Sequence, residues 1–213
     1  MRRFILIGGA AAAALTLAAC EKPGGAPDQS AKAVNVPQDV AGAATGVATA
    51  AAGSVSTDAF VRDAAIGDMY EIAAAKIALE RSKSSEVKNL AQMILTDHTA
   101  SSEKLKMLVS GGQVKATLPT ELDERRKGML DNLRAPGGPD FDGRYILQQT
   151  MAHHEGFLLM NGYKTAGSDP ALKAFAAEVE PKIQMHMDMA QKMAGEAVKH
   201  TGEATAPPAK PAQ

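Results

Sequence analysis

This 213-residue sequence has little of several residue types on which small domains often depend. With one cysteine, the chain can form no internal disulfide, so its stability must come from a packed core. It has no tryptophan and only 4% aromatic residues, while alanine is abundant, which favours closely packed helices over sheets. Its formal net charge of -1 gives no electrostatic reason to expect nucleic-acid binding. We therefore expect an all-α domain with no nucleic-acid partner.

Familiar catalytic motifs are also missing from the sequence. There is no glycine-rich phosphate loop, no serine-hydrolase elbow and no cysteine beyond Cys20 that could serve as a nucleophile. After Cys20 no apolar run is long enough to cross a bilayer. These absences direct attention to the first residues of the chain and to the ionisable side chains of the predicted helices.

Residues 1–19 predict a secretory signal peptide. Arg2 and Arg3 precede a short apolar run, and small residues follow it. Its end, Leu17-Ala18-Ala19-Cys20, resembles the lipobox of bacterial lipoproteins, which implies cleavage before Cys20 and lipid attachment to that residue. The expected partner is then a membrane, reached through lipid on Cys20, with the domain in the periplasm and the choice of inner or outer membrane undecided. An ordinary signal peptide with a stray cysteine is the alternative.

The rest of the chain divides by composition. Residues 20–55 are rich in Ala, Gly, Pro and Val without a sustained period and predict a flexible tether. Residues 200–213 predict a disordered tail. Residues 56–199 remain as one domain, and their amphipathic segments indicate a four-helix bundle whose two hairpins are joined by a long crossover containing a short connector helix.

Capping residues set the expected helix bounds. Ser56 or Thr57 can cap the first helix, Gly111 can end the second, Thr120 can cap the connector helix, and Asp169 before a proline can begin the last. The predicted helices cover residues 56–81, 86–110, 120–133, 140–165 and 169–199.

Each of the four long helices carries a candidate ligand in its predicted apolar stripe: Glu71, His98, His154 and His186. Their sequence neighbours lie about 100° away around the helix, at the edge of the core or outside it, and could orient or replace them. These neighbours are Asp97, His153 and Glu155. The stripe of residues 56–81 also contains Asp68.

Imidazole and carboxylate groups that project inward from facing helices form metal sites in helical bundles. The cofactor expected from such a set is a transition metal, namely Zn, Fe or Cu. Met189 and Met193 share a face with His186 and would suit Cu(I), but methionines at helical spacing are more often packing residues. The alternative to a metal is a hydrogen-bonded network of Glu71 with the three histidines, since an unpaired buried polar group costs about 1–3 kcal/mol.

The sequence resembles a family of bacterial exported proteins with a ferritin-like domain of unknown function, described as outer-membrane proteins. The resemblance covers residues 60–193 and implies a ferritin-like bundle in the cell envelope, but no established activity. The chain departs from the family pattern at His153-His154, where that pattern reads Asp-His. The resemblance rests on Phe60-Val61, Ala64-Ala65, Gly67, Glu71, Val87-Lys88, Asp97-His98-Thr99, Leu118-Pro119, Phe141-Asp142, Tyr145, Leu172-Lys173-Ala174-Phe175-Ala176, Pro181, His186 and Ala190-Gln191.

Three functions are compatible with these features. The first is a non-enzymatic metal-binding or metal-sensing module. The second is a structural or envelope-stress interaction protein without a metal, and the sequence identifies no protein partner for it. The third, a two-metal oxidase, is disfavoured, because such bundles use Glu-x-x-His motifs, whereas Leu95 and Ile183 stand three residues before His98 and His186.

Overall fold

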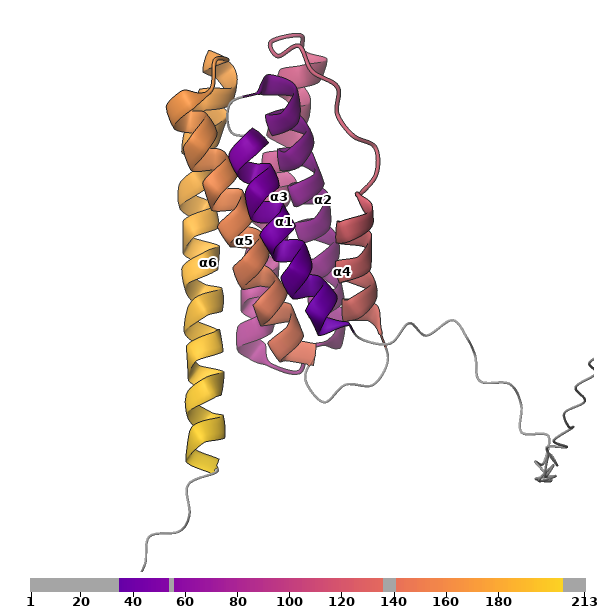
Figure 1. Cartoon of the computed structure of the whole chain (residues 1–213), viewed down its shortest axis with the longest axis vertical. Helices are drawn as coiled ribbons and strands as arrows, with labels where there is room; N and C mark the ends of the chain where they lie inside the picture. Colours follow the sequence, from indigo (N-terminus) through magenta and orange to yellow (C-terminus); the bar gives the residue numbers. More distant parts are fainter. Residues whose placement is uncertain (1–34, 54–55, 136–140, 205–213) are drawn as a thin grey trace, which may run out of the picture. The chain divides into compact units, whose positions relative to one another are not determined.

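A computed structural model describes residues 35–53, 56–135 and 141–204, and within them every regular element is an α-helix (Figure 1). The all-α prediction is therefore confirmed. The predicted signal peptide and Cys20 lie outside the described residues. No helix in the described part of the chain is both long and apolar enough to cross a membrane. The helices are α1 (Val36–Gly53), α2 (Thr57–Arg81), α3 (Ser85–Ser110), α4 (Glu124–Arg134), α5 (Phe141–Ala166) and α6 (Pro170–Ala204).

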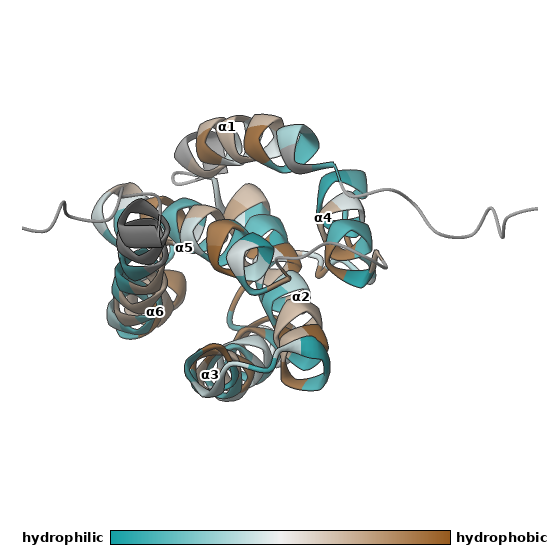
Figure 2. Ribbon diagram, turned by 90° about the horizontal axis from the view of Figure 1, so that it is seen from below, coloured by the Kyte–Doolittle hydropathy of each residue, from teal (hydrophilic) through white to brown (hydrophobic). Residues whose placement is uncertain are grey.

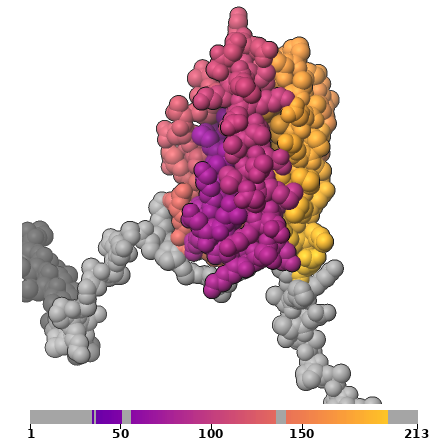
Figure 3. Space-filling view, turned by 180° about the vertical axis from the view of Figure 1, so that it is seen from behind, coloured from indigo at the N-terminus to yellow at the C-terminus, as the bar shows by residue number. Residues whose placement is uncertain are grey.

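Four of these helices pack as two hairpins. α2 lies along α3 and α5 lies along α6, and the hairpins meet where α2 contacts α5 and α3 contacts α6 (Figures 1 and 2). α4 belongs to the crossover between the hairpins and packs beside α2. Figure 3 shows α3 next to α6 on the face opposite α1. The resulting helical bundle encloses a region that side chains from α2, α3, α5 and α6 all reach.

Side-chain caps explain where the helices begin. The Oγ atoms of Ser56 and Ser84 accept hydrogen bonds from backbone amides in the first turns of α2 and α3. Asp169 caps α6 in the same way, as its position before Pro170 predicted. The connector helix is capped by Asp123 and not by Thr120, because the Asp123 carboxylate accepts the Arg126 amide hydrogen bond at 2.7 Å.

The tether prediction is wrong for part of its range, because residues 36–53 form α1. This helix packs against α5 and also contacts α2 and α4 (Figure 2). Its Asp39 is buried and accepts hydrogen bonds from Asn132 on α4 at 2.8 Å and from Gln148 on α5 at 2.6 Å. The small side chains that hid a helical period in the sequence allow this close approach. At the other end of the chain, α6 continues to Ala204, beyond the predicted end of the domain.

The core has two apolar clusters with a polar layer between them along the bundle. In one cluster, which we call the aromatic cluster, the Phe60 ring packs at a tilt against Tyr163 with ring centroids 4.1 Å apart and meets Phe175 edge-on at 6.2 Å. The other, which we call the alanine- and leucine-rich cluster, takes most of its residues from α2, α3 and α4 and also contains Tyr70 and Tyr145. Buried ionisable residues lie between the two clusters. This polar layer comprises Asp68, Glu71, His98, His153 and His186.

Candidate metal centre

Three histidines from three helices meet in the polar layer. His98 comes from α3, His153 from α5 and His186 from α6, and their side chains are almost completely buried. One nitrogen of each ring lies within 4.8 Å of the other two. The closest pair is Nε2 of His153 and Nδ1 of His186, at 3.3 Å. Three imidazoles at this spacing are a compact nitrogen donor set.

The outward-facing nitrogen of each ring has an acceptor. Nδ1 of His98 donates to Oδ1 of Asp68 at 2.7 Å, and Nδ1 of His153 donates to the carbonyl oxygen of Gln149 at 2.9 Å. Nε2 of His186 donates to Oδ2 of Asp97 at 3.1 Å. A carboxylate or carbonyl can only accept, so each of these nitrogens carries its proton. The three tautomers and ring orientations are thereby fixed.

The three remaining nitrogens therefore carry lone pairs when the rings are neutral. They are Nε2 of His98, Nε2 of His153 and Nδ1 of His186. Nε2 of His98 is buried and has no hydrogen-bond partner among the described residues. Histidines that ligate a metal usually donate their second N–H to a carboxylate or carbonyl, as all three do here. The arrangement has the form of a metal-binding triad.

The three histidine rings differ in the direction in which their surroundings shift the pKa. Burial, together with the nearby His98 and His186, holds the pKa of His153 well below its usual value. Burial, followed by the charge of His98, lowers the pKa of His186 to about 4. Burial alone would lower the pKa of His98 too, but the hydrogen bond and charge of Asp68 outweigh it and raise that pKa. At neutral pH His153 and His186 are thus neutral imidazoles, the form that binds metal ions.

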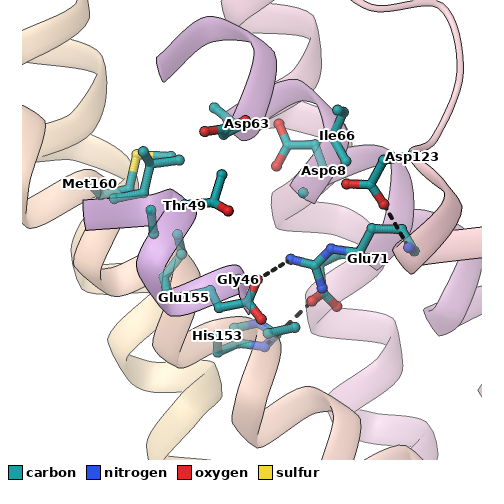
Figure 4. Close-up of a pocket in the computed structure, with 18 of the residues that line it drawn as sticks. Gly46, Thr49, Asp63, Ile66, Asp68, Glu71, Asp123, His153, Glu155 and Met160 are labelled. Atoms are coloured by element: carbon teal, nitrogen blue, oxygen red, sulfur yellow. Dashed lines mark hydrogen bonds and ion pairs between the residues drawn. The ribbon is translucent and has the colours of Figure 1, made fainter. Parts of the chain in front are cut away.

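Glu71 lies beside the triad without belonging to it. Its Oε1 is 3.8 Å from Nδ1 of His153, and its Oε2 is buried and accepts no hydrogen bond from the described residues (Figure 4). Burial raises the pKa of Glu71 to about 7, although the charges of His98 and Arg126 act in the opposite direction. A carboxyl group with this pKa can be neutral or charged at physiological pH, according to what lies next to it.

Asp97, expected as a neighbour that orients a ligand, contacts two residues of α6. Its Oδ2 accepts the His186 hydrogen bond, and its Oδ1 lies 2.9 Å from Nζ of Lys182. Burial alone would raise the pKa of Asp97, but the ammonium group of Lys182 and the His186 ring hold it below its usual value. A charged Asp97 is a good acceptor for the imidazole N–H and holds the ring of His186 in place.

Glu155, also expected near the site, is paired elsewhere. Its carboxylate accepts two hydrogen bonds from Arg125, both at 2.9 Å, and one from Arg126 at 2.8 Å. The Arg126 guanidinium in turn lies 4.6 Å from the centre of the Tyr70 ring. These contacts fasten the start of α4 to α5, and Glu155 lies outside the triad.

The structure corrects the assignment of His154. Its side chain is exposed, and the neighbouring His153 takes the inward position. The prediction followed the stripe through Leu147 and Met151, but Leu147 is exposed, and the buried face of α5 includes Gln149 and His153 instead. Because α1, α2 and α6 all cover α5, its buried surface extends around the helix and includes polar residues. The most apolar stripe of α5 is therefore a poor guide to its inner face.

Asp68 is a residue of the site for which no role was predicted from the sequence. It lies in the predicted stripe of α2, three residues before Glu71, but only the folded chain brings it to His98, thirty positions away. A carboxylate within an apolar stripe is itself a signal that a buried partner exists. That signal indicates the need for a partner but does not identify it.

Comparison with known families gives one result. A family described as a domain of unknown function (DUF4142) matches residues 42–193. The chain belongs to this family. The matched range begins within α1 and includes Asp68, Glu71 and all three histidines of the triad. No curated protein and no solved structure matches the chain.

Proposed function

We propose that this protein is a lipid-anchored protein of the bacterial envelope that binds one transition-metal ion through His98, His153 and His186. The observation that carries the proposal is the direction of the six ring nitrogens. Three donate outward to fixed acceptors, and the three others carry lone pairs when the rings are neutral, in a space where one nitrogen from each ring lies within 4.8 Å of its neighbours. Small shifts of the rings would bring all three within the Zn–N distance of about 2.0–2.1 Å from one ion.

The donor set favours a borderline divalent ion such as Zn²⁺ or Cu²⁺. Neutral imidazoles suit these ions, whereas Cu(I) prefers sulfur donors. The methionines that share a face with His186 do not supply such donors, because Met189 and Met193 pack against the alanine- and leucine-rich cluster. Two-iron chemistry is disfavoured because Leu95 and Ile183 occupy the positions where bundle di-iron sites carry glutamates. Binding or sensing of a single ion is the role we propose, without catalysis.

Bound metal would join three helices at one point of the bundle. An ion that binds only the folded state stabilises it by RT ln(1 + [L]/Kd), or about 2.7 kcal/mol at a free concentration of 100 Kd. In a metal sensor or store this stabilisation is the direct consequence of occupancy. It also gives a readout that needs no knowledge of the biological partner.

The deciding experiment is metal analysis of the full chain, purified without a metal-binding tag. We expect close to one equivalent of Zn or Cu and a rise in Tm when Zn²⁺ is restored to the chelator-treated protein. His98→Ala and His153→Ala should lose both effects, and the matched variant His154→Ala should keep them. A folded wild-type chain that neither retains a metal nor gains stability from Zn²⁺, Cu²⁺ or Fe²⁺ would overturn the proposal in favour of a structural role.

The ferritin-like architecture and the lipid anchor are part of the same proposal. Two antiparallel hairpins, α2 with α3 and α5 with α6, joined by a long crossover support a ferritin-like four-helix bundle. The lipobox-like end of the signal segment supports lipid on Cys20. In a bacterial host, Cys20→Ser should release the protein from the membrane fraction, while the wild-type chain incorporates labelled fatty acid. A wild-type chain that takes up no label would remove the anchor from the proposal.

A further inference from the structure

A cavity of about 320 Å³ leads to the proposed metal centre. It lies between α1, α2, α5 and the start of α4, and its walls include His98, His153 and Glu71 (Figure 4). His98 and His153 line it directly, so an ion bound to the triad would lie next to this space. The lining of the cavity therefore bears on what reaches the site.

Among the charged side chains that line the cavity, carboxylates outnumber arginines. Both arginines of the lining, Arg125 and Arg126, are engaged by Glu155. The exposed Arg62 donates a hydrogen bond to Asp63, and it does so to Oδ1 only. Besides Glu155, the acidic residues of the lining are Asp63, Asp68, Glu71 and Asp123. An acidic cleft with low-dielectric walls concentrates cations and repels anions.

The solvent exposure of these carboxylates decreases from the surface inward. Asp123 is exposed, the Asp63 side chain is 15% exposed, and Asp68 and Glu71 are 4% and 3% exposed. In the view of Figure 4, Asp63 and Asp68 lie near one end of the cavity, and Glu71 and His153 lie towards the other.

Three of the carboxylates each keep one oxygen available. Oδ2 of Asp63, Oδ2 of Asp68 and Oε2 of Glu71 are buried without a hydrogen-bond partner in the described part of the chain. Because a buried oxygen without a partner is costly, each of these atoms needs a partner that a cation or a water molecule in the cavity can supply.

We infer that this cavity is the path by which a divalent metal cation reaches the histidine triad, with Asp63 attracting it at the mouth and Asp68 passing it to His98. Oδ1 of Asp68 accepts the hydrogen bond of His98, and its buried Oδ2 has no partner among the described residues and remains available to a cation. The inference rests on the proposed function, because a path for metal ions requires a metal site at its inner end. It adds that the rate of binding is set by α1 and α2, which contribute no ligand.

Gly67 offers a direct way to block the path. It lines the cavity, and a Cβ added to it would meet no atom within 4 Å. Asp63 and Glu71 lie one turn before and one turn after Gly67 on α2. Gly67→Leu should therefore fill the cavity between them without a clash at its Cβ. Gly67→Ala is the matched control, because it makes the same backbone change and leaves most of the space open. Both substitutions raise helix propensity, so neither should prevent folding.

The experiment uses stopped-flow mixing of the metal-free full chain with Co²⁺, whose visible absorption reports nitrogen coordination. We expect Gly67→Leu to slow association and dissociation together by about tenfold, with Kd nearly unchanged, while Gly67→Ala behaves as wild type. Asp63→Asn should slow association by about threefold or more at low ionic strength and weaken its salt dependence, since charge steering contributes factors of about 10–10³ in a whole cleft. Asp58→Asn, an exposed change on the same helix outside the cavity, should not.

The outcomes separate the two proposals. If wild-type protein develops no Co²⁺ absorption, the metal site itself fails. If it binds Co²⁺ through the histidines but Gly67→Leu and Asp63→Asn bind as fast as wild type, the metal site stands and the path is wrong. Parallel slowing of both rates in Gly67→Leu, without loss of affinity, supports the path, because an obstruction raises the barrier to passage and leaves the ligands intact.

Discussion

The aromatic cluster and the polar layer are both buried, but they satisfy their buried groups in different ways. In the aromatic cluster, Phe60, Tyr163 and Phe175 pack ring on ring, and the Tyr163 hydroxyl lies 2.9 Å from Oγ1 of Thr57. In the polar layer, oxygens of Asp68 and Glu71 and a nitrogen of His98 have no partner among the described residues. The first region is complete with protein atoms alone, whereas the second has donor atoms left over. Stability should therefore reside in the first, and ligand dependence in the second.

The largest effect should come from Phe175→Ala in the aromatic cluster. Removing a fully buried aromatic ring leaves a cavity and costs about 3–5 kcal/mol of unfolding free energy. The loss should be the same in Zn²⁺ and in chelator, because Phe175 does not touch the polar layer. Urea denaturation in both conditions measures it. A loss that depends on Zn²⁺ would show that the two regions are not energetically separate.

His153→Ala should give the converse result in the polar layer. With Zn²⁺ at 100 times the wild-type Kd, the wild-type chain should gain about 2.7 kcal/mol and the variant close to nothing. In chelator the variant should unfold as a normal two-state protein, because its aromatic cluster is intact. Paired urea titrations with and without Zn²⁺ measure both quantities. A variant that keeps the full Zn²⁺ gain would exclude His153 as a ligand.

Glu71→Gln tests the cost of an unsatisfied carboxylate in the metal-free protein. The pKa of Glu71 is raised from 4.5 to about 7, so the folded protein holds a proton that the unfolded chain releases. The stability that the neutral carboxyl contributes is complete below pH 4.5 and is lost as pH rises through 7. Glutamine stays neutral, so the variant should match wild type near pH 4.5 and exceed it above pH 7 by up to about 3 kcal/mol. Urea denaturation across this pH range measures the difference.

The exposed Glu103→Gln on α3 is the matched control for that series. It makes the same chemical change away from the core, so its stability should follow wild type at every pH. If Glu71→Gln is less stable than wild type at pH 8, the ionised carboxylate must be satisfied in the folded protein. The contrast between the two regions would then be weaker than we describe.

Gly46→Ala tests whether α1 closes the polar side of the bundle. An added Cβ would lie 2.0 Å from the Glu155 carboxyl carbon, and Arg125 and Arg126 hold that carboxylate in place. We expect α1 to shift and unfolding free energy to fall by about 1–2 kcal/mol, with faster proteolysis within residues 36–53. Gly67→Ala, which meets no atom, should instead be neutral or stabilising by up to about 1 kcal/mol. Equal behaviour of the two variants would mean that α1 does not pack on Glu155.

How well the sequence predicts this structure depends on which faces of each helix pack against other helices. The bounds of α2, α3 and α5 agree within about a residue with the predicted helices. For α2 and α3, strong caps and apolar periodicity specify them. α1 was missed because its alanine- and glycine-rich stretch has little amphipathic contrast. Its contacts with Gln148 and Glu155 depend on tertiary structure.

The candidate site was predicted in part for the same physical reason. His98 and His186 lie on the apolar stripes of α3 and α6, and both are buried as those stripes indicate. On α5 the stripe was misleading, because a helix covered on several sides buries polar residues as well as apolar ones. Asp68 and the cavity lining depend on distances between helices, which periodicity within one helix cannot supply.

The smallest effect should come from His154→Ala, which differs from His153→Ala by one position and a rotation of about 100° around α5. His154 is exposed, so its replacement should change unfolding free energy by less than about 0.5 kcal/mol and leave the Zn²⁺ gain intact. Zinc titration monitored by thermal unfolding, with the two variants side by side, makes the comparison within a single helix turn. If His154→Ala and His153→Ala lost the Zn²⁺ gain equally, both rings would have to reach the ion. Two adjacent side chains of α5 cannot both point into the bundle at once, so α5 would have to rotate when the metal binds. The polar layer would then change conformation on binding, whereas the aromatic cluster beside it would not.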